Sequence, residues 1–405
     1  NFATIVQGTN RIEGKEIRFR QTPAPEDEKP REPDRFASVN GPGALQFLTR
    51  KGLNGEPLAD PTPIRITWKE GMAYRGPKNE VEFHGDVKLR STSDKMDSGK
   101  MMVQFREVAA ATQPASAPAT RPGAEPAKPP GLGFDFENYS RRKITRIEAD
   151  QDVMVFSERL DEQGRLLRQL QLTGEKLVYD ADANEINVYK EGTLLVSDYR
   201  PPQRGTKRRP SGELATSPDD VERPFQAAFG WKELMNLSQD ERSVIMKGDA
   251  WAVFASGRHV VLKELLNVPP WPKLTGGRLT RIRSEKLSAT FHPPEEPALA
   301  RPAPPAAQTG PRIGPLKSFY AEGGVHLIDG DEIRRVAECE KLSYDRETDI
   351  VMLLGSLPAQ PRKPAKLRQE DPRTGRAQTF AGERITWYRK TDKITVVKAV
   401  GMGTR

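Results

Sequence analysis

Short runs of residues with a period of two recur along the chain. Leu177 and Tyr179 alternate with Lys176 and Val178, and the same period is present over 394–397. Successive side chains of a strand point to opposite faces, so this period, with its β-branched and aromatic residues, predicts β-strands.

One stretch leaves two interpretations open. Residues 157–172 are rich in Glu, Arg and Leu, which suits a helix, but Gly164 falls in the middle. A hairpin with a loop at 161–164 fits at least as well. With so few helical candidates, we predict a nearly all-β chain.

A six-residue pattern recurs: a small residue, two charged residues, Ile or Leu, any residue, and an aromatic residue. Clear copies begin at Gly14, Gly174, Cys339 and Gly382. A strand precedes several copies, and a turn with a further strand follows, which gives three-strand units. One unit cannot bury its apolar face alone, so we expect the units to stack. The inward side chains would include Ile17, Phe19, Leu177, Tyr179, Leu342, Tyr344, Ile385 and Trp387.

A longer period is superimposed on this pattern. Trp68 and Trp231 each begin a Trp-Lys-Glu triplet, and a Gly-Asp pair follows seventeen residues after each Trp. The first pair contains Asp86 and the second Asp249. Two unlike units therefore alternate, and their combination occurs at least twice.

Composition narrows the function classes. The chain has 405 residues, a net charge of +8, 36% apolar residues, one cysteine and four histidines. A lone cysteine cannot form an internal disulfide, and no Cys/His zinc spacing exists. No apolar run is long enough for a transmembrane helix, and no signal peptide is visible. Both ends, Asn1 and Arg405, adjoin repeat copies, so we expect a longer native protein.

Several isolated features allow a functional and a structural interpretation. Asp86 and Asp249 could be a carboxylate pair of a carbohydrate-active enzyme, but Asp after Gly commonly caps a turn. The basic cluster at 207–209 lacks interleaved aromatic residues, which argues against nucleic acid. Cys339 replaces Gly in its repeat copy, so we interpret it as a small buried filler. We favour the structural interpretation of each feature.

The residues of the repeat resemble a known family. Residues 323–355 contain Gly-Gly-Val-His-Leu, then Cys-Glu-Lys-Leu-Ser-Tyr-Asp, then Ile-Val-Met-Leu-Leu-Gly. This succession resembles the OstA-like repeat of the LptA- and LptC-type lipopolysaccharide-transport family, and residues 152–188 resemble it too. The resemblance implies an all-β fold, a stacked, V-shaped and solenoid-like β-jelly-roll of antiparallel sheets, here with long Pro-rich loops.

The resemblance also divides the chain into repeat units and loops. OstA-like units are expected at 1–106, 134–200, 225–292 and 315–405, and Pro-rich loops at 21–35, 107–133, 201–224 and 293–314, with a further Pro-rich stretch at 357–375. These polar stretches cannot bury enough apolar surface to form a core.

In function, the resemblance implies a non-enzymatic protein without cofactor or metal, involved in outer-membrane biogenesis. Its location would be the periplasm or the cell envelope. Its partners would be lipopolysaccharide or another amphipathic lipid, and other OstA-like proteins joined end to end through their sheets; no nucleic acid is expected. The candidate lipid-binding groove consists of Val87, Leu89, Val153, Val155, Leu177, Tyr179, Ile186, Val188, Val325, Leu327, Leu342, Tyr344, Ile350, Met352, Ile385, Trp387, Ile394 and Val396. Alternatively, these side chains fill a closed core, and the protein is a structural or interaction scaffold.

Overall fold

The computed structural model describes most of the chain. The described residues are 2–7, 9–22, 34–51, 57–92, 94–107, 142–161, 163–199, 225–257, 277–293, 316–330, 334–356, 363–371 and 374–404. They form two compact units, the first from the described residues up to 154 with 176–184, and the second from those of 155–175 and 185–405. Two strands, β8 (Arg142–Leu160) and β9 (Leu166–Asp180), contribute to both units.

The first unit is built from antiparallel strands and one short 3-10 turn, η1 (Gly76–Lys78). Its remaining strands are β1 (Ala3–Gln7), β2 (Asn10–Thr22), β3 (Asp34–Lys51), β4 (Pro57–Trp68), β5 (Gly71–Arg75), β6 (Glu80–Arg90) and β7 (Asp94–Glu107). β1 pairs with β2, β2 with β3, and β6 with β7.

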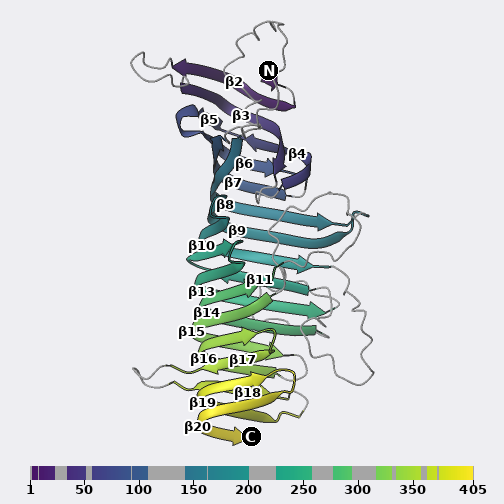
Figure 1. Cartoon of the computed structure of the whole chain (residues 1–405), viewed down its shortest axis with the longest axis vertical. Helices are drawn as coiled ribbons and strands as arrows, with labels where there is room; N and C mark the ends of the chain where they lie inside the picture. Colours follow the sequence, from purple (N-terminus) through teal and green to yellow (C-terminus); the bar gives the residue numbers. More distant parts are fainter. Residues whose placement is uncertain are drawn as a thin grey trace, which may run out of the picture. The chain divides into compact units, whose positions relative to one another are not determined.

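The second unit continues the same construction, and from β10 to β20 its strands follow one another in chain order (Figure 1). Its strands are β10 (Glu185–Asp198), β11 (Phe225–Trp231), β12 (Leu234–Ser238), β13 (Ser243–Gly257), β14 (Gly277–Phe291), β15 (Leu316–Gly330), β16 (Arg334–Asp345), β17 (Ile350–Leu354), β18 (Ala365–Glu370), β19 (Ala377–Tyr388) and β20 (Lys393–Thr404). β13, β14, β15 and β16 pair in succession, and β19 pairs with β20, always antiparallel.

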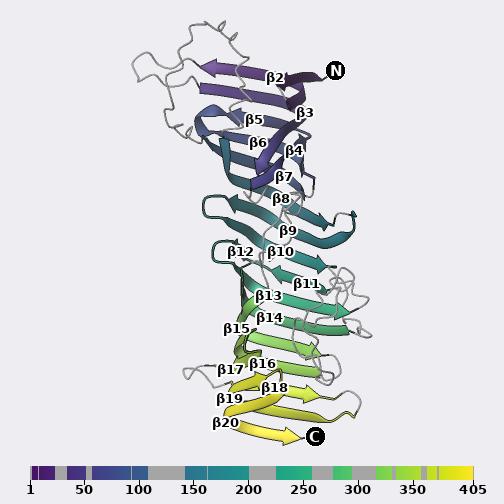
Figure 2. The same cartoon turned by 45° about the vertical axis from the view of Figure 1, so that its right-hand side comes forward.

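One pairing pattern occurs three times. A long strand pairs with two further strands, one on each half of its length, and both of these pair with the next long strand. This holds for β3 with β4 and β5, for β10 with β11 and β12, and for β16 with β17 and β18. Figure 2 shows β17 and β18 in the layer between β16 and β19. The described strands therefore form three structural repeats, each with one divided layer.

Several long strands, among them β6, β13 and β15, carry a bulge near their middle. At the bend of β13 the register shifts between Lys247 and Ala250, where Gly248 and Asp249 have φ of 79° and 47°. β15 bends in the same way at Gly323 and Gly324, with φ of 83° and 58°. Such bulges, with residues in the left-handed region, kink a strand and raise its local twist. The bends form a corner that separates each sheet into two half-sheets.

Four-residue turns mark one of these half-sheets, which we call the turn half-sheet; the other is the far half-sheet. In the second unit the turns occupy 239–242, 346–349 and 389–392. The last residue of each, Arg242, Asp349 and Asp392, has φ between 50° and 54°. A turn of this length places Asp345 opposite Ile350, and Tyr344 opposite Val351. The turn therefore decides which face each following residue occupies.

The all-β fold class of antiparallel stacked strands is confirmed, and residues 157–172 form a hairpin whose loop lies between β8 and β9. Two predictions of facing are wrong. Ile350 and Met352 lie on the outer face, because the register places Val351 and Leu353 opposite the inward Tyr344 and Leu342. Phe19 is 39% exposed, because β1 pairs only with residues 10–14 of β2 and Phe19 has a paired strand on one side only, β3.

The Pro-rich stretches have different outcomes. The stretch 357–375 contains β18, whose Ala365 and Leu367 are fully buried, so its expected loop character is wrong for 365–370. The short apolar period there is only two side chains long, which is too little for a sequence pattern to reveal. The other Pro-rich stretches lie almost entirely outside the described residues. This holds for most of 21–35, for 107–133 except its first residue, for 201–224 with the basic cluster at 207–209, and for nearly all of 293–314.

Candidate functional site

The turn half-sheet of the second unit carries an unbroken apolar row next to the corner. Each member lies directly opposite the next on the neighbouring strand, so all share the inner face. Row A consists of Val188, Met235, Met246, Leu287, Ala321, Leu342, Leu353, Ile385 and Val396. Its members from Val188 to Ile385 are at most 2% exposed. Nine strands at about 4.8 Å each make a continuous apolar surface about 40 Å long.

A second row runs parallel to row A, one inward position nearer the turns. Row B consists of Ile186, Leu237, Val244, Ala289, Phe319, Tyr344, Val351, Trp387 and Ile394. Tyr344 and Trp387 in this row stand two positions before four-residue turns, which explains the aromatic residue that ends their copies of the repeated sequence pattern. Burial raises the pKa of the Tyr344 hydroxyl above its ordinary value.

The far half-sheet contributes the opposing apolar surface. Row C consists of Leu194, Phe229, Ala252, Ile282, Leu327, Ala337, Leu367 and Phe380, again directly opposite one another. Ala252, Ala337 and Leu367 are fully buried. Rows A, B and C together line an interior in which small and flexible side chains, such as Ala321 and Met246, occur among larger ones.

The structure places most of the predicted groove residues inside their units. Eleven of them are buried, namely Val87, Leu89, Val153, Leu177, Tyr179, Val188, Val325, Leu327, Leu342, Ile385 and Trp387. Val155, Ile186, Tyr344, Ile394 and Val396 are half-buried on the same faces. Sequence reasoning missed Met235, Met246, Leu353 and Leu367, although the period of two around Met235 and Met246 could have revealed them.

The Gly-Asp pairs lie at the corner on its outer side. Asp249 accepts hydrogen bonds from Arg283 Nε at 2.6 Å and Nη2 at 2.8 Å, and pairs with Lys232 Nζ at 2.8 Å. Arg283 and Lys232 hold the pKa of the Asp249 carboxyl far below its usual range. Asp86 pairs similarly with Lys69 at 2.8 Å and Lys88 at 3.1 Å. Each carboxylate is neutralised within its own unit, which favours the structural interpretation.

The two Trp-Lys-Glu triplets occupy equivalent places in their own units. The Lys69 amide donates to the Gly85 carbonyl at 2.7 Å, and the Lys232 amide donates to Gly248 at the same distance. A Cβ on Gly43 would lie 2.5 Å from the Trp68 ring, and one on Gly192 would lie equally close to Trp231. The longer sequence period therefore corresponds to the same corner structure in two repeats, in which the absence of a side chain on glycine leaves room for the Trp ring.

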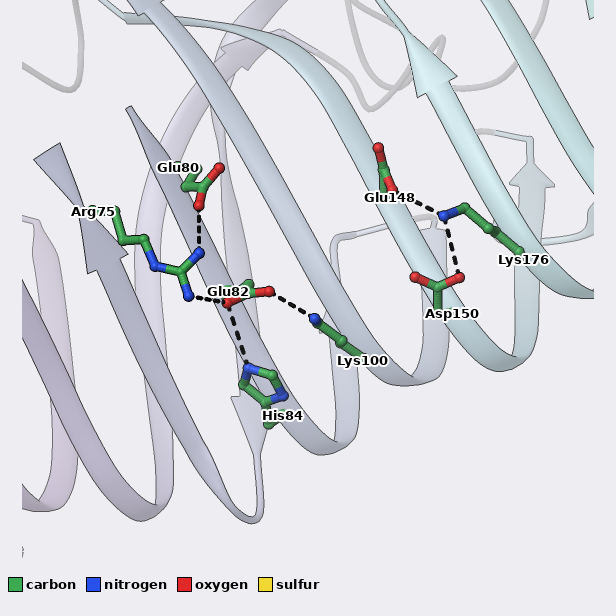
Figure 3. A network of polar contacts seen from close by, with 8 residues as sticks. All are labelled: Arg75, Glu80, Glu82, His84, Lys100, Glu148, Asp150 and Lys176. Carbon is green, nitrogen blue, oxygen red and sulfur yellow. Dashed lines mark hydrogen bonds and ion pairs between the residues drawn. The ribbon is translucent and has the colours of Figure 1, made fainter. Parts of the chain in front are cut away.

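The outer face of the first unit carries a network of charges (Figure 3). Glu82 accepts from Lys100 Nζ at 2.6 Å and from Arg75 Nη2 at 2.9 Å, and Arg75 Nη1 donates to Glu80 at 2.7 Å. The hydrogen bond from Lys100 is the main cause that lowers the pKa of Glu82. On β8, Glu148 pairs with Lys176 at 3.1 Å. Opposite charges on adjacent strands stabilise this pairing.

The remaining sequence candidates lie apart from the interior or at its corner. His84 lies beside Glu82, 3.8 Å from its carboxylate, and His326 is exposed. Cys339 is half-buried, and burial raises the pKa of its thiol to about 12. Across the described ranges, no three His, Cys, Asp or Glu side chains gather closely enough to hold a metal ion. In the same ranges no helix is long and apolar enough to cross a membrane.

The strand pairing and the interior rows define a class: an all-β protein of stacked antiparallel strands with an apolar interior. No protein-family profile matches the chain, and no curated protein matches its sequence. Among solved structures, the chain is similar to LptH from Pseudomonas aeruginosa, the LptA-homologous periplasmic component of the lipopolysaccharide transport device. The identity is 13% and the TM-score 0.27, over 46% of this chain and 98% of that chain. The fold described above rests on the strand pairing alone.

Proposed function

We propose that this chain is a non-enzymatic lipid-binding protein of the cell envelope that holds acyl chains in its interior. The observation that carries the proposal is the continuity of row A, with nine apolar residues on successive strand segments and no polar interruption. A continuous row suits an extended hydrocarbon chain, because each buried methylene contributes about 0.8 kcal/mol without polar recognition.

The composition of the interior supports the same proposal. Met235 and Met246 are adjacent on row A, and methionine adapts its shape to irregular apolar neighbours. Ala321 on row A and Ala252 and Ala337 on row C leave short side chains between larger ones. An acyl chain would displace flexible side chains rather than rigid ones. Lipopolysaccharide is the finer proposal, and the periplasm is the proposed location.

Site-specific crosslinking tests the proposal. A photoreactive benzoylphenylalanine replaces Leu342 on row A, and the matched control replaces Met352, which lies on the outer face of the adjacent strand. Each variant is irradiated with palmitic acid and, separately, with lipopolysaccharide. We expect acyl adducts at position 342 and none above background at 352. Equal labelling of both positions, or none at 342, would contradict an acyl-binding interior.

A second function, a scaffold with a filled core, is favoured by the burial itself. Leu353, Leu367 and Ile385 have no exposed surface, as expected for side chains that pack on each other. The same crosslinking separates the two functions, because a filled core gives no adduct at 342 in a variant that remains folded by circular dichroism. In the scaffold, partners would add at sheet edges.

A further inference from the structure

In the far half-sheet of the second unit, the inward side chains nearest the strand ends form a fourth row, which changes from apolar to polar along the unit. Row D consists of Val196, Ala227, Phe254, Thr280, Asp329, Arg335, Gln369 and Gln378. It is apolar from β10 to β13 and polar from β14 onward. Asp329 is 3% exposed and accepts a hydrogen bond from Thr280 at 2.6 Å. Of the polar members only Asp329 is buried, whereas Arg335 and Gln369 are half-buried and Gln378 is exposed. A buried polar side chain next to an apolar interior requires an explanation.

Arg335 is the member of row D that reaches the other half-sheet. Its Nη2 donates to both carboxylate oxygens of Asp392 at 2.9 Å. Its guanidinium carbon lies 4.7 Å from the centroid of the Trp387 ring, which is a cation–π contact. Trp387 Nε1 also donates to Asp392, at 3.0 Å. The three side chains therefore form a closed set of mutual contacts, which we call the clasp.

The clasp joins two half-sheets at their ends farthest from the corner. Arg335 is the second residue of β16, in the part that pairs with β18. Trp387 is on row B, and Asp392 ends the turn between β19 and β20. Only 14% of the Arg335 side chain is exposed, against 46% of Asp392, so the carboxylate covers the guanidinium from the solvent side. The line along which these ends meet is the mouth of the interior.

A second arginine, Arg389, lies next to Trp387 of the clasp. The Arg389 guanidinium carbon lies 5.5 Å from the Tyr344 ring centroid and 5.8 Å from that of Trp387, and Nη1 lies 3.5 Å from Asp349. Two buried polar atoms near the clasp, Arg335 Nε and Asp349 Oδ2, have no hydrogen-bond partner among the described residues. Unsatisfied buried polar groups lower the cost of opening.

We propose that Arg335, Trp387 and Asp392 close the mouth of the third repeat, and that acyl chains reach this part of the interior only when the clasp opens. In the described part of the second repeat, row D is apolar from Val196 to Phe254 and forms no contact of this kind. Lipid exchange would thus begin at the second repeat. The gating role rests on the proposed lipid-binding function, whereas the closure of the mouth does not.

A buried thiol tests the closure. Ala337 is 0% exposed. It lies two residues after Arg335, on the same side of β16. The reporter is Ala337→Cys with Cys339→Ser, labelled with N-ethylmaleimide in the full chain. Asp392→Asn and Arg335→Ala are added separately. The matched control is Lys341→Ala, which removes an ion pair with Glu322 that lies at the corner rather than the mouth.

We expect labelling at least about fivefold faster with either clasp variant, since the rate of labelling a buried thiol follows the population of the open state. The Lys341→Ala control should change it less than about twofold. Unchanged labelling in folded Asp392→Asn protein would overturn the proposal, even if Arg335→Ala fails to fold.

Uptake of cis-parinaric acid, measured by its fluorescence, tests the gating role. Faster uptake by Asp392→Asn supports the gate. Faster thiol labelling with unchanged uptake overturns the gate but leaves the closed mouth. No uptake by any folded variant, including the unchanged chain, overturns the lipid-binding function and with it the gating role, while the labelling result still decides the closure.

Discussion

The two neighbours Met352 and Leu353 provide a sharp test of which face of β17 is buried. Leu353 is fully buried on row A, directly opposite Leu342 and Ile385. Met352 lies opposite Ser343 on the outer face and is half-buried. Truncating either residue to alanine removes three heavy atoms, so the two substitutions are matched in size but lie in different surroundings.

The magnitude follows from burial. Leu353→Ala removes about three carbon groups at about 0.8 kcal/mol each, or about 2.4 kcal/mol. The cavity left in a row closed on all sides raises the total to about 3 to 4 kcal/mol. Met352→Ala should cost less than about 1 kcal/mol, because its neighbours are polar and partly solvated.

The assay must resolve the repeats, since stacked repeats can unfold separately. Hydrogen exchange read by mass spectrometry, with urea below the global transition, gives the local free energy of unfolding for peptides from β16 to β19. We expect faster exchange there for Leu353→Ala and little change for Met352→Ala. Equal costs, or a larger cost for Met352→Ala, would refute the assignment of faces and hence rows A and B.

Three further substitutions test the corner and the charged face. Gly248→Ala should cost about 1 to 2 kcal/mol in urea unfolding, because φ is 79° and the new Cβ would lie 2.4 Å from Glu233 Cγ. Asp249 has a lowered pKa in the folded state, so its stabilisation is present above its unfolded pKa of about 3.9 and is lost as pH falls below it. Asp249→Asn should therefore flatten the acid side of the stability–pH curve, and an unchanged acid limb would contradict this. Glu82→Gln should cost about 1 to 2 kcal/mol at low salt, and less in 1 M NaCl, since it leaves Lys100 without its carboxylate; a salt-independent cost would argue against the ion pairs.

The sequence predicted the strands well because their period is a local property. Tyr179, Tyr344 and Trp387, the aromatic ends of three repeat copies, are inward positions two residues before four-residue turns. The copy that ends at the exposed Phe19 is different. The facing of Ile350 and Met352 could not be predicted, since it depends on the length of the turn ending at Asp349 and its left-handed φ. One residue more or less in that turn would exchange the two faces.

The candidate site was predictable in kind but not in full. Parts of rows A and C, such as Leu342 and Leu327, follow from strands whose alternation is visible in the sequence, whereas Leu367 was missed. The clasp was not predictable, because Arg335 and Asp392 are separated by 57 positions and meet only through the folding of two half-sheets. A charged residue at the start of a strand, as Arg335 is, carries no sequence signal that distinguishes an inward from an outward side chain.

The most direct measurement is a map of where a diazirine-bearing fatty acid attaches to the unmodified chain, read by peptide mass spectrometry after irradiation. The account predicts attachment to inner positions of the second unit, with row A residues such as Met246 and Leu287 among them. Attachment confined to outer positions such as Met352 and Tyr388, or absent from a folded sample at saturating ligand, would contradict the claim that this interior receives hydrocarbon.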